Sequence, residues 1–413
     1  MSESGPRSWE RGQGDPVGPR PLADSVLRML WEERQISRAD IARRTGLSRS
    51  TVSRIVPPMV AMRLVADVGV GPSRGGRRPR LLEFRDDSFV ILGVDMGATH
   101  VSVALMNLRE RLLAWQHRFH PVRADPAGTS DLILDLCAKC LAESRLSRRR
   151  LLGIGMAVPS PVDPRDPERL SAVVLPSWRG RSVVQSLRDR YGVPVFVDND
   201  ANLGALAEHW WGAGRGIDDF AYIKVATGIG SGHMIRGQIY RGATGVAGEI
   251  GHVTIDPNGV PCICGNRGCL ATLIGTEPLL DRARALLPQF PESPLHHAEL
   301  TITALEDEAL ADDPLALQVV AEAAGYLGIA VAGMLNLMNP ARVIVGGGIA
   351  RLKERLLAPL REAVLRRTLV HSVAASDIQT SELGPRDIAL GAATYVLDSA
   401  LSDPRLFSGV NRS

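Results

Sequence analysis

Two segments of this 413-residue chain share one pattern, in which an apolar strand leads into a glycine-rich turn and then into a second strand. The first is FVILGVDMGATHVSVALMN (89–107) and the second is AYIKVATGIGSGHMIRGQIY (221–240). Turns of this kind can offer backbone N–H groups to phosphate, although glycine turns also join ordinary hairpins. Because the pattern occurs twice, we expect an α/β body made of two related lobes.

The charges divide the chain into a basic N-terminal region and a mildly acidic remainder. Residues 1–85 hold 16 Arg and no Lys against 9 acidic residues, a net charge of +7, whereas the remainder carries −4. A basic segment favours a polyanionic partner, although a solvated arm would carry the same charge. Residues 1–20 are polar and rich in Gly and Pro, which predicts a disordered tail without a signal peptide.

Residues 21–85 have the spacing of a winged helix-turn-helix domain. Ser37 and Ser48 are the expected N-caps of two helices that are separated by a turn at Gly46. The second of these helices leaves arginines and small polar side chains exposed at its N-terminal end, as reading of the DNA major groove requires. The predicted DNA-reading residues are Arg49, Ser50, Thr51, Ser53 and Arg54.

An arginine- and glycine-rich segment from Gly71 to Arg80 is expected to form the wing. Its arginines would contact DNA phosphates or a minor groove, and they are Arg74, Arg77, Arg78 and Arg80. Pro57 and Pro58 follow the recognition helix and should end or kink it. A three-helix packing module without a DNA role is the alternative. Because turn chemistry, polar face and basic wing coincide, we expect binding to double-stranded operator DNA.

The most specific chemistry in the sequence is the spacing H-x9-C-x-C-x4-C. The four candidate ligands are His252, Cys262, Cys264 and Cys269. Three thiolates and one imidazole fill a tetrahedral zinc shell with no open position, which predicts a structural Zn²⁺. The remaining cysteines, Cys137 and Cys140, lie in an apolar helical stretch and are expected to pack in the core.

A strand at 193–197 runs into a cluster of carboxylates and amides, namely Asp198, Asn199, Asp200 and Asn202. Such groups at the carboxyl end of a strand suit a polyhydroxylated ligand, and one of them could abstract a hydroxyl proton. The alternative is capping of the following helix by Asp200 or Asn202.

Together these segments resemble the ROK family of repressors, open reading frames and sugar kinases, whose fold is a pair of actin-like, hexokinase-like lobes. The resemblance extends from about Leu22 to Leu397 and rests on the ordered motifs GVDMGATH, GMAVPSPVD, DNDAN, ATGIGSG, GEIGH and LNLMNPARVIVGGGIAR. It implies an N-terminal lobe at 88–200, a C-terminal lobe with the zinc loop at 201–400, and a tail at 401–413.

The resemblance also implies roles for individual residues. Asp200 would be the catalytic base if the body is active. The sugar would be bound by Asn199, Asp200, Glu249 and His252. Phosphate and nucleotide would be bound by Asp95, Gly97, Thr99, Thr227, Gly228, Gly230 and Gly347. ATP and Mg²⁺ would be cofactors only if kinase activity is retained.

Five positions depart from the family's kinase pattern. Ala98 adds a Cβ where backbone must approach phosphate, and Ala271 stands where the family has a sugar-contacting glutamate. Ser160, Ala226 and Ser231 replace glycines. Together these departures favour a sensor over an efficient kinase.

Family members that carry the winged helix are typically repressors that respond to a sugar, and members without it are typically kinases. We therefore expect a cytoplasmic sugar-sensing repressor, without membrane association because no run of 18 apolar residues occurs. We expect a homodimer or homotetramer on a roughly palindromic DNA site. The alternative is an active hexose or amino-sugar kinase that carries a DNA-binding head.

Overall fold

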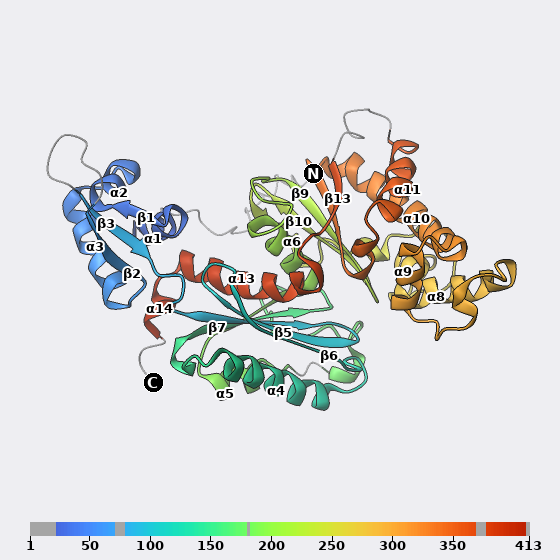
Figure 1. Cartoon of the computed structure of the whole chain (residues 1–413), viewed down its shortest axis with the longest axis horizontal. Coiled ribbons are helices and arrows are strands. Elements are labelled where there is room, and N and C mark those ends of the chain that lie inside the picture. The colour runs from blue at the N-terminus through green and yellow to red at the C-terminus, as the bar shows by residue number, and fades with distance from the viewer. Residues whose placement is uncertain (1–21, 71–78, 180–181, 369–376, 410–413) are drawn as a thin grey trace, which may run out of the picture. The chain divides into compact units, whose positions relative to one another are not determined.

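The computed structural model describes residues 22–70, 79–179, 182–368 and 377–409. The chain divides into two units (Figure 1). The first, here called the head, contains the residues up to Asp86 together with those from Asp398 onward, and the second, the body, contains 87–397. The predicted tail at 1–20 lies outside the described residues, as do Arg74, Arg77 and Arg78 in the predicted wing.

The head contains a helix-turn-helix followed by a β-hairpin. Its elements are α1 (Leu22–Glu33), β1 (Gln35–Ser37), α2 (Arg38–Thr45), α3 (Arg49–Ala61), β2 (Val65–Val70) and β3 (Arg80–Phe84), with the strands in the order β1-β3-β2. Ser37 Oγ accepts the Asp40 N–H and Ser48 Oγ accepts the Thr51 N–H, each at 3.1 Å. Gly46 ends α2 with a φ of 69°. The predicted caps are therefore confirmed.

The recognition helix α3 does not end at Pro57 and Pro58, because it continues to Ala61. Both prolines are exposed, whereas Val52, Val56 and Met59 are buried along the opposite side of the helix. Burial of this apolar stripe offsets the backbone hydrogen bonds that the prolines cannot donate.

The C-terminal residues group with the head. They comprise the end of α13 (Asp387–Ser402) and α14 (Arg405–Gly409). Arg28 donates a hydrogen bond to Asp398 at 2.7 Å, and Phe407 is fully buried. The segment expected to be a tail at 401–413 thus includes a helix that contributes a core residue.

The first lobe of the body is a five-stranded sheet in the order β6-β5-β4-β7-β8. The neighbours β6, β5 and β4 are antiparallel, whereas β7 and β8 run parallel to β4. Its strands are β4 (Val90–Met96), β5 (His100–Asn107), β6 (Leu112–Phe119), β7 (Leu151–Val158) and β8 (Val195–Asn199). The helices α4 (Pro126–Ser144) and α5 (Val184–Tyr191) cover one face (Figure 1), and the predicted core residues Cys137 and Cys140 are buried there.

The second lobe repeats this topology in the order β11-β10-β9-β12-β13. Again three strands are antiparallel neighbours and two continue in parallel. Its strands are β9 (Phe220–Val225), β10 (Ile229–Ile235), β11 (Gln238–Ile239), β12 (Arg342–Gly346) and β13 (Asp377–Thr380). Its helices are α6 (Asp200–Trp210), α7 (Ala271–Ile274), α8 (Thr276–Leu286), α9 (Ile302–Leu310), α10 (Pro314–Met338) and α11 (Glu354–Leu365). The two related lobes expected from the repeated hairpin pattern are thus confirmed.

Helix α10 is long and apolar enough to cross a membrane when judged by length and composition alone. However, 61% of its most apolar 18-residue window is buried inside the structure. Its residues belong to the main hydrophobic core of the second lobe. The burial explains the apolar composition of this helix, because a central core helix has the same composition.

Helix α13 lies directly against the first sheet and against α6 (Figure 1). A Cβ on Gly155 of β7 would lie 1.8 Å from the carbonyl oxygen of Ala392, and a Cβ on Gly391 would lie 1.8 Å from that of Leu203. Only glycine permits backbones to approach so closely. These contacts hold α6, whose first turn carries Asp200, in a fixed place relative to the first lobe.

We therefore expect Gly155→Ala to lower the free energy of unfolding of the body by about 1–3 kcal/mol or more, because the backbone of α13 must shift. The matched control is Gly325→Ala in α10, where a Cβ meets nothing within 4 Å. That change should be neutral or stabilising by roughly 0.5–1 kcal/mol. Chemical denaturation monitored by circular dichroism measures both. Equal stability of Gly155→Ala and the parent chain would contradict the packing described.

Candidate functional site

The two glycine turns face each other in the body. The first connects β4 to β5 and the second connects β9 to β10, and Thr99 Oγ1 lies 3.5 Å from Thr227 Oγ1. Around Gly228 there is space for a Cβ without any contact within 4 Å. Gly347 is in the left-handed region at φ 83°, and a Cβ there would lie 2.1 Å from Val225 O. The predicted nucleotide residues from three separate segments thus converge beside β9.

Within the first turn, the imidazole of His100 lies against the backbone of Gly97, where a Cβ would be only 2.3 Å from the ring. His100 Nε2 is 2.9 Å from Asp95 Oδ2. Burial alone would raise the pKa of Asp95, but attraction to His100 and Lys224 lowers it below its ordinary value. Asp95 is therefore an ionised carboxylate although it is only 3% exposed.

The residues after β8 begin helix α6. Asn199 is its N-cap: Oδ1 accepts the Ala201 N–H at 2.9 Å, and Nδ2 donates to Ser160 O at 3.1 Å. The sequence alternative had given the capping role to Asp200 or Asn202, and the structure gives it to Asn199. The Asn199 amide is therefore already engaged by the protein. Asp200, which is 6% exposed, is the first residue of the helix.

The carboxylate of Asp200 forms a buried ion pair with Lys224 of β9, whose Nζ lies 2.5 Å from Asp200 Oδ2. Burial alone would lower the pKa of Lys224, but Asp200, Asp95 and Asp387 together raise it above its ordinary value. Lys224 therefore stays charged. Lys224 belongs to none of the sequence motifs, but a lysine inside the apolar strand AYIKVA is a usable signal for a buried ion pair.

A third carboxylate, Asp387 at the start of α13, belongs to the same buried group. It accepts a hydrogen bond from Tyr222 Oη at 2.6 Å. Burial raises the pKa of Asp387 to about 6. Three carboxylates thus stabilise the Lys224 ammonium, Asp200 of α6 by direct contact and Asp95 of β4 and Asp387 of α13 through their charge.

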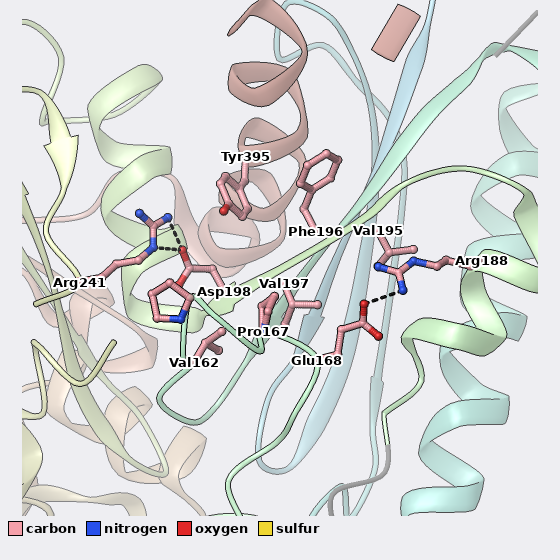
Figure 2. Close-up of a pocket in the computed structure, with 11 residues that line it drawn as sticks. Val162, Pro167, Glu168, Arg188, Val195, Phe196, Val197, Asp198, Arg241 and Tyr395 are labelled. Atoms are coloured by element: carbon pink, nitrogen blue, oxygen red, sulfur yellow. Dashed lines mark hydrogen bonds and ion pairs between the residues drawn. The ribbon is translucent and has the colours of Figure 1, made fainter. Parts of the chain in front are cut away.

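Asp198 points to a different place. It accepts hydrogen bonds from Arg241, at 2.9 Å from Nε, and from Asn202 Nδ2 at 3.1 Å. Figure 2 shows the Arg241–Asp198 pair on one side of a cavity of about 220 Å³, with the rings of Phe196 and Tyr395 close to it. Asp198 therefore anchors the end of β8 to Arg241 and Asn202, whereas Asp200 belongs to the buried charged group around Lys224.

The predicted metal ligands come together at the short 3₁₀ turn Ile250–His252 and the loop that follows it. One ligand atom from each of the four residues lies within 4.8 Å of the others: His252, Cys262, Cys264 and Cys269. Cys262 Sγ is 3.4 Å from His252 Nδ1, and Cys264 Sγ is 3.6 Å from Cys269 Sγ. This Cys3His arrangement is compatible with a structural zinc ion.

The other ring nitrogen of His252 faces Glu249, with Nε2 3.8 Å from Oε2. Burial and the neighbouring charge of Asp200 raise the pKa of Glu249 to about 7. The structure therefore brings three predicted sugar-binding residues, Asp200, Glu249 and His252, into one neighbourhood beside the metal ligands.

Ser231 supports the same neighbourhood from β10. Its hydroxyl donates to Gly248 O at 3.0 Å and lies 3.0 Å from His233 Nε2. Ser231 stands where the family's kinases have a glycine. The structure shows its buried side chain holding the backbone of the residue before Glu249. Ala271 begins α7 and offers no carboxylate there.

In the head, the predicted DNA-reading residues share one surface at the N-terminal end of α3. Arg49, Ser50, Ser53 and Arg54 are exposed and Thr51 is half-buried. Ser48 Oγ lies 2.8 Å from both Ser50 Oγ and Thr51 Oγ1, so the cap residue also orients two of these hydroxyls. Arg80, at the start of β3, is exposed and 3.6 Å from Asp67.

Comparison with known proteins identifies both units. Residues 91–399 match the ROK family, and residues 25–65 match the winged helix-turn-helix DNA-binding family. The chain is 32% identical over 376 residues to the xylose repressor of Bacillus subtilis, covering 91% of this chain and 94% of the relative. It is 29% identical to the DNA-binding transcriptional dual regulator NagC of Escherichia coli, with 92% of each chain covered.

Solved structures agree. A ROK family transcriptional regulator described as a homologue of the Escherichia coli MLC protein superposes with a TM-score of 0.79 at 25% identity, covering 94% of this chain and 98% of that one. A ROK family glucokinase from Streptomyces griseus, in complex with glucose and AMPPNP, gives 0.67 at 27% identity but covers only 74% of this chain and 98% of its own. The fold and sites define a two-lobed sugar-kinase-like body joined to a winged helix. The chain belongs to the ROK family.

Proposed function

We propose that this chain is a DNA-binding transcriptional repressor, acting in the cytoplasm, whose body senses a sugar or sugar derivative. The observation that carries the proposal is the combination of an exposed recognition helix with a buried charged group in which Asp200, at the position of the catalytic base, is ion-paired with Lys224. The exposed helix supports DNA binding, and the ion pair favours ligand sensing over phosphoryl transfer.

Three features of the head support DNA binding. The N-terminal end of α3 exposes Arg49 and Arg54, whose guanidinium groups suit bidentate contacts to guanine. The hydroxyl of Ser48, which hydrogen-bonds to those of Ser50 and Thr51, lies on the same turn of the helix. The relatives that match both units, over more than 90% of this chain, bear the names of repressors or transcriptional regulators.

The body retains the residue types of a sugar site, but Asp200, the residue at the position of the base, is already in an ion pair. A general base must be free to take a proton from a substrate hydroxyl. Asp200 Oδ2 instead lies 2.5 Å from a buried ammonium. The carboxylate can still accept a hydrogen bond from a hydroxyl, as binding requires. The names of two relatives, a xylose repressor and an N-acetylglucosamine repressor, support a sugar as the ligand.

A ligand changes DNA affinity only if it prefers one conformation of the protein over another. In a homodimer or homotetramer, closure of the two lobes on a sugar would change the spacing of two heads. The operator would then be roughly palindromic, with half-sites set by the two-fold symmetry.

The cluster of three cysteines and His252 would hold a structural Zn²⁺. The ion would neutralise the thiolates and fix the loop that carries Glu249 and His252. Purified protein should therefore contain about one zinc per chain, measured by mass spectrometry of the metal. Cys269→Ser should lose it. Cys137→Ala, which removes a buried thiol from α4, should keep it. Retention of full zinc by Cys269→Ser would contradict this assignment.

For the head, Arg54→Ala should weaken binding to DNA from upstream of the chain's own gene by about tenfold or more, since it removes a base-edge contact. Fluorescence anisotropy at fixed salt measures the change. Arg366→Ala, which removes the exposed arginine that follows α11 and pairs with Glu362, is the matched control and should bind normally. Equal losses in both variants, or none in Arg54→Ala, would argue against α3 as the reading helix.

The alternative is an active sugar kinase with a DNA-binding head. A coupled ADP-release assay across hexoses and amino sugars separates the two functions. We expect no turnover above background, because the ion pair with Lys224 withholds Asp200 from proton transfer. Robust turnover that Asp200→Asn abolishes would establish the kinase instead.

A further inference from the structure

Two sulfur atoms of the predicted metal site are in contact with each other. Cys264 Sγ lies 3.6 Å from Cys269 Sγ, and both residues are free thiols. A disulfide needs its sulfurs to approach to about 2 Å. Rotation of two side chains in the same short loop can supply this approach. The pair is therefore placed for oxidation to a disulfide.

The backbone of the loop keeps these two thiols together. Gly265 donates its N–H to Cys262 O at 3.0 Å, which closes a tight turn that contains Cys264. Gly265 and Gly268 have φ of 93° and 56°, a region that favours glycine. These two positions reverse the chain and return it to Cys269. The proximity of the two sulfurs is thus built into the backbone.

The cysteines of the loop differ in their access to solvent. Cys264 is exposed, Cys262 is half-buried and Cys269 is fully buried. Oxidants attack accessible thiolates, and a redox-sensitive cysteine is often placed next to a second cysteine that resolves the first product. Metal ligation keeps such thiols deprotonated. An oxidant would therefore meet Cys264 first and find Cys269 beside it.

The other two cysteines of the chain provide the contrast. Cys137 and Cys140 are fully buried in α4, where Cys140 Sγ donates to Val103 O at 3.5 Å. Burial raises the pKa of both thiols above the ordinary value. Protonated, inaccessible thiols are poor targets for oxidants. Oxidation should therefore be confined to the loop.

We propose that Cys264 and Cys269 form a reversible disulfide with hydrogen peroxide as the oxidant, so that the metal loop is a redox-sensitive modification site. In the cytoplasm disulfides are usually transient and redox-sensing, which suits a bond of this kind. The inference goes beyond sugar sensing and rests on the zinc site of the proposed function.

The reaction balances in two steps. The Cys264 thiolate attacks one oxygen of the peroxide, the O–O bond breaks, and a sulfenic acid forms while the departing hydroxide takes a proton to become water. The Cys269 thiolate then attacks Cys264 Sγ, the S–O bond breaks, and the second hydroxide also leaves as water. The two thiolates lose two electrons in total, which reduce one peroxide to two waters.

The disulfide removes two of the four donors. Cys262 and His252 alone do not close a tetrahedral shell, so the chain would release its Zn²⁺. Cys262 Sγ lies 3.4 Å from His252 Nδ1, and His252 Nε2 faces Glu249 at 3.8 Å. Loss of the ion would therefore loosen the turn that carries Glu249. Oxidation would in this way reach the body's proposed ligand site.

The first experiment treats the reduced, zinc-loaded full chain with a small molar excess of hydrogen peroxide. A colorimetric chelator measures released zinc, and mass spectrometry of a digest with blocked free thiols identifies any disulfide. Bound zinc should fall from about one per chain to near zero. A Cys264–Cys269 link should appear in step, and dithiothreitol with added zinc should reverse both changes.

The matched control is Cys140→Ala, which should release zinc as the parent chain does. Full retention of zinc by the peroxide-treated parent chain would overturn the proposal. Release without a disulfide, or with a Cys137–Cys140 link in place of the loop link, would overturn it as well.

A second experiment tests the effect on the neighbouring turn. Hydrogen exchange measured by mass spectrometry should increase over residues 249–269 on oxidation and return after reduction with zinc, because the loop loses its cross-link to the ion. Exchange in α4, which carries Cys137 and Cys140, should not change. Unaltered exchange over 249–269 would contradict the proposed loosening.

The outcomes separate this inference from the zinc assignment. If the reduced chain holds no zinc, the assignment fails, and the presence or absence of the Cys264–Cys269 link still decides whether the pair is oxidised. If the chain holds zinc but peroxide forms no link, the inference fails and the zinc site stands.

Discussion

The ion pair between Lys224 and Asp200 is the interaction on which the chemistry of the body depends. Two charges removed from water are tolerated only when they lie close to each other and their remaining hydrogen-bonding groups have partners. Lys224 comes from β9 of the second lobe, whereas Asp200 follows β8 of the first. The pair therefore links the second glycine hairpin to the strand end that would carry the catalytic base. Under the proposed sensing function, the pair keeps Asp200 as a hydrogen-bond acceptor for a ligand and disfavours its use as a kinase base.

A second constraint comes from the loop that carries the predicted metal ligands. His252 directs Nδ1 toward Cys262 and Nε2 toward Glu249, so the predicted metal ligands and Glu249 meet at one ring. Ser231 holds the backbone of Gly248 from β10. In the proposed sensing function, groups that are supported in this way would lose little freedom when a sugar binds, which would favour discrimination between similar ligands.

The sequence predicted what is encoded locally. The helix caps at Ser37 and Ser48, the repeated lobes and the clustering of the four metal ligands all follow from short patterns. Contacts between distant segments were not predictable in this way. The Lys224–Asp200 pair joins residues 24 positions apart on different elements, and Phe407 is buried in the head although it lies near the opposite end of the chain. Of the two expected effects of Pro57 and Pro58, an end of the helix does not occur, because tertiary burial of Val56 and Met59 outweighs the proline penalty.

Helix α13 is common to both units, since its residues to Leu397 group with the body and those from Asp398 with the head. Thermodynamic linkage between sugar binding and DNA binding tests whether the body regulates the head. The affinity for operator DNA is measured by anisotropy at one salt concentration, with and without a neutral sugar that calorimetry has shown to bind. We predict at least a fivefold change in the dissociation constant for DNA, which is on the order of the coupling usually found between two allosteric sites. An unchanged constant at saturating sugar would contradict it.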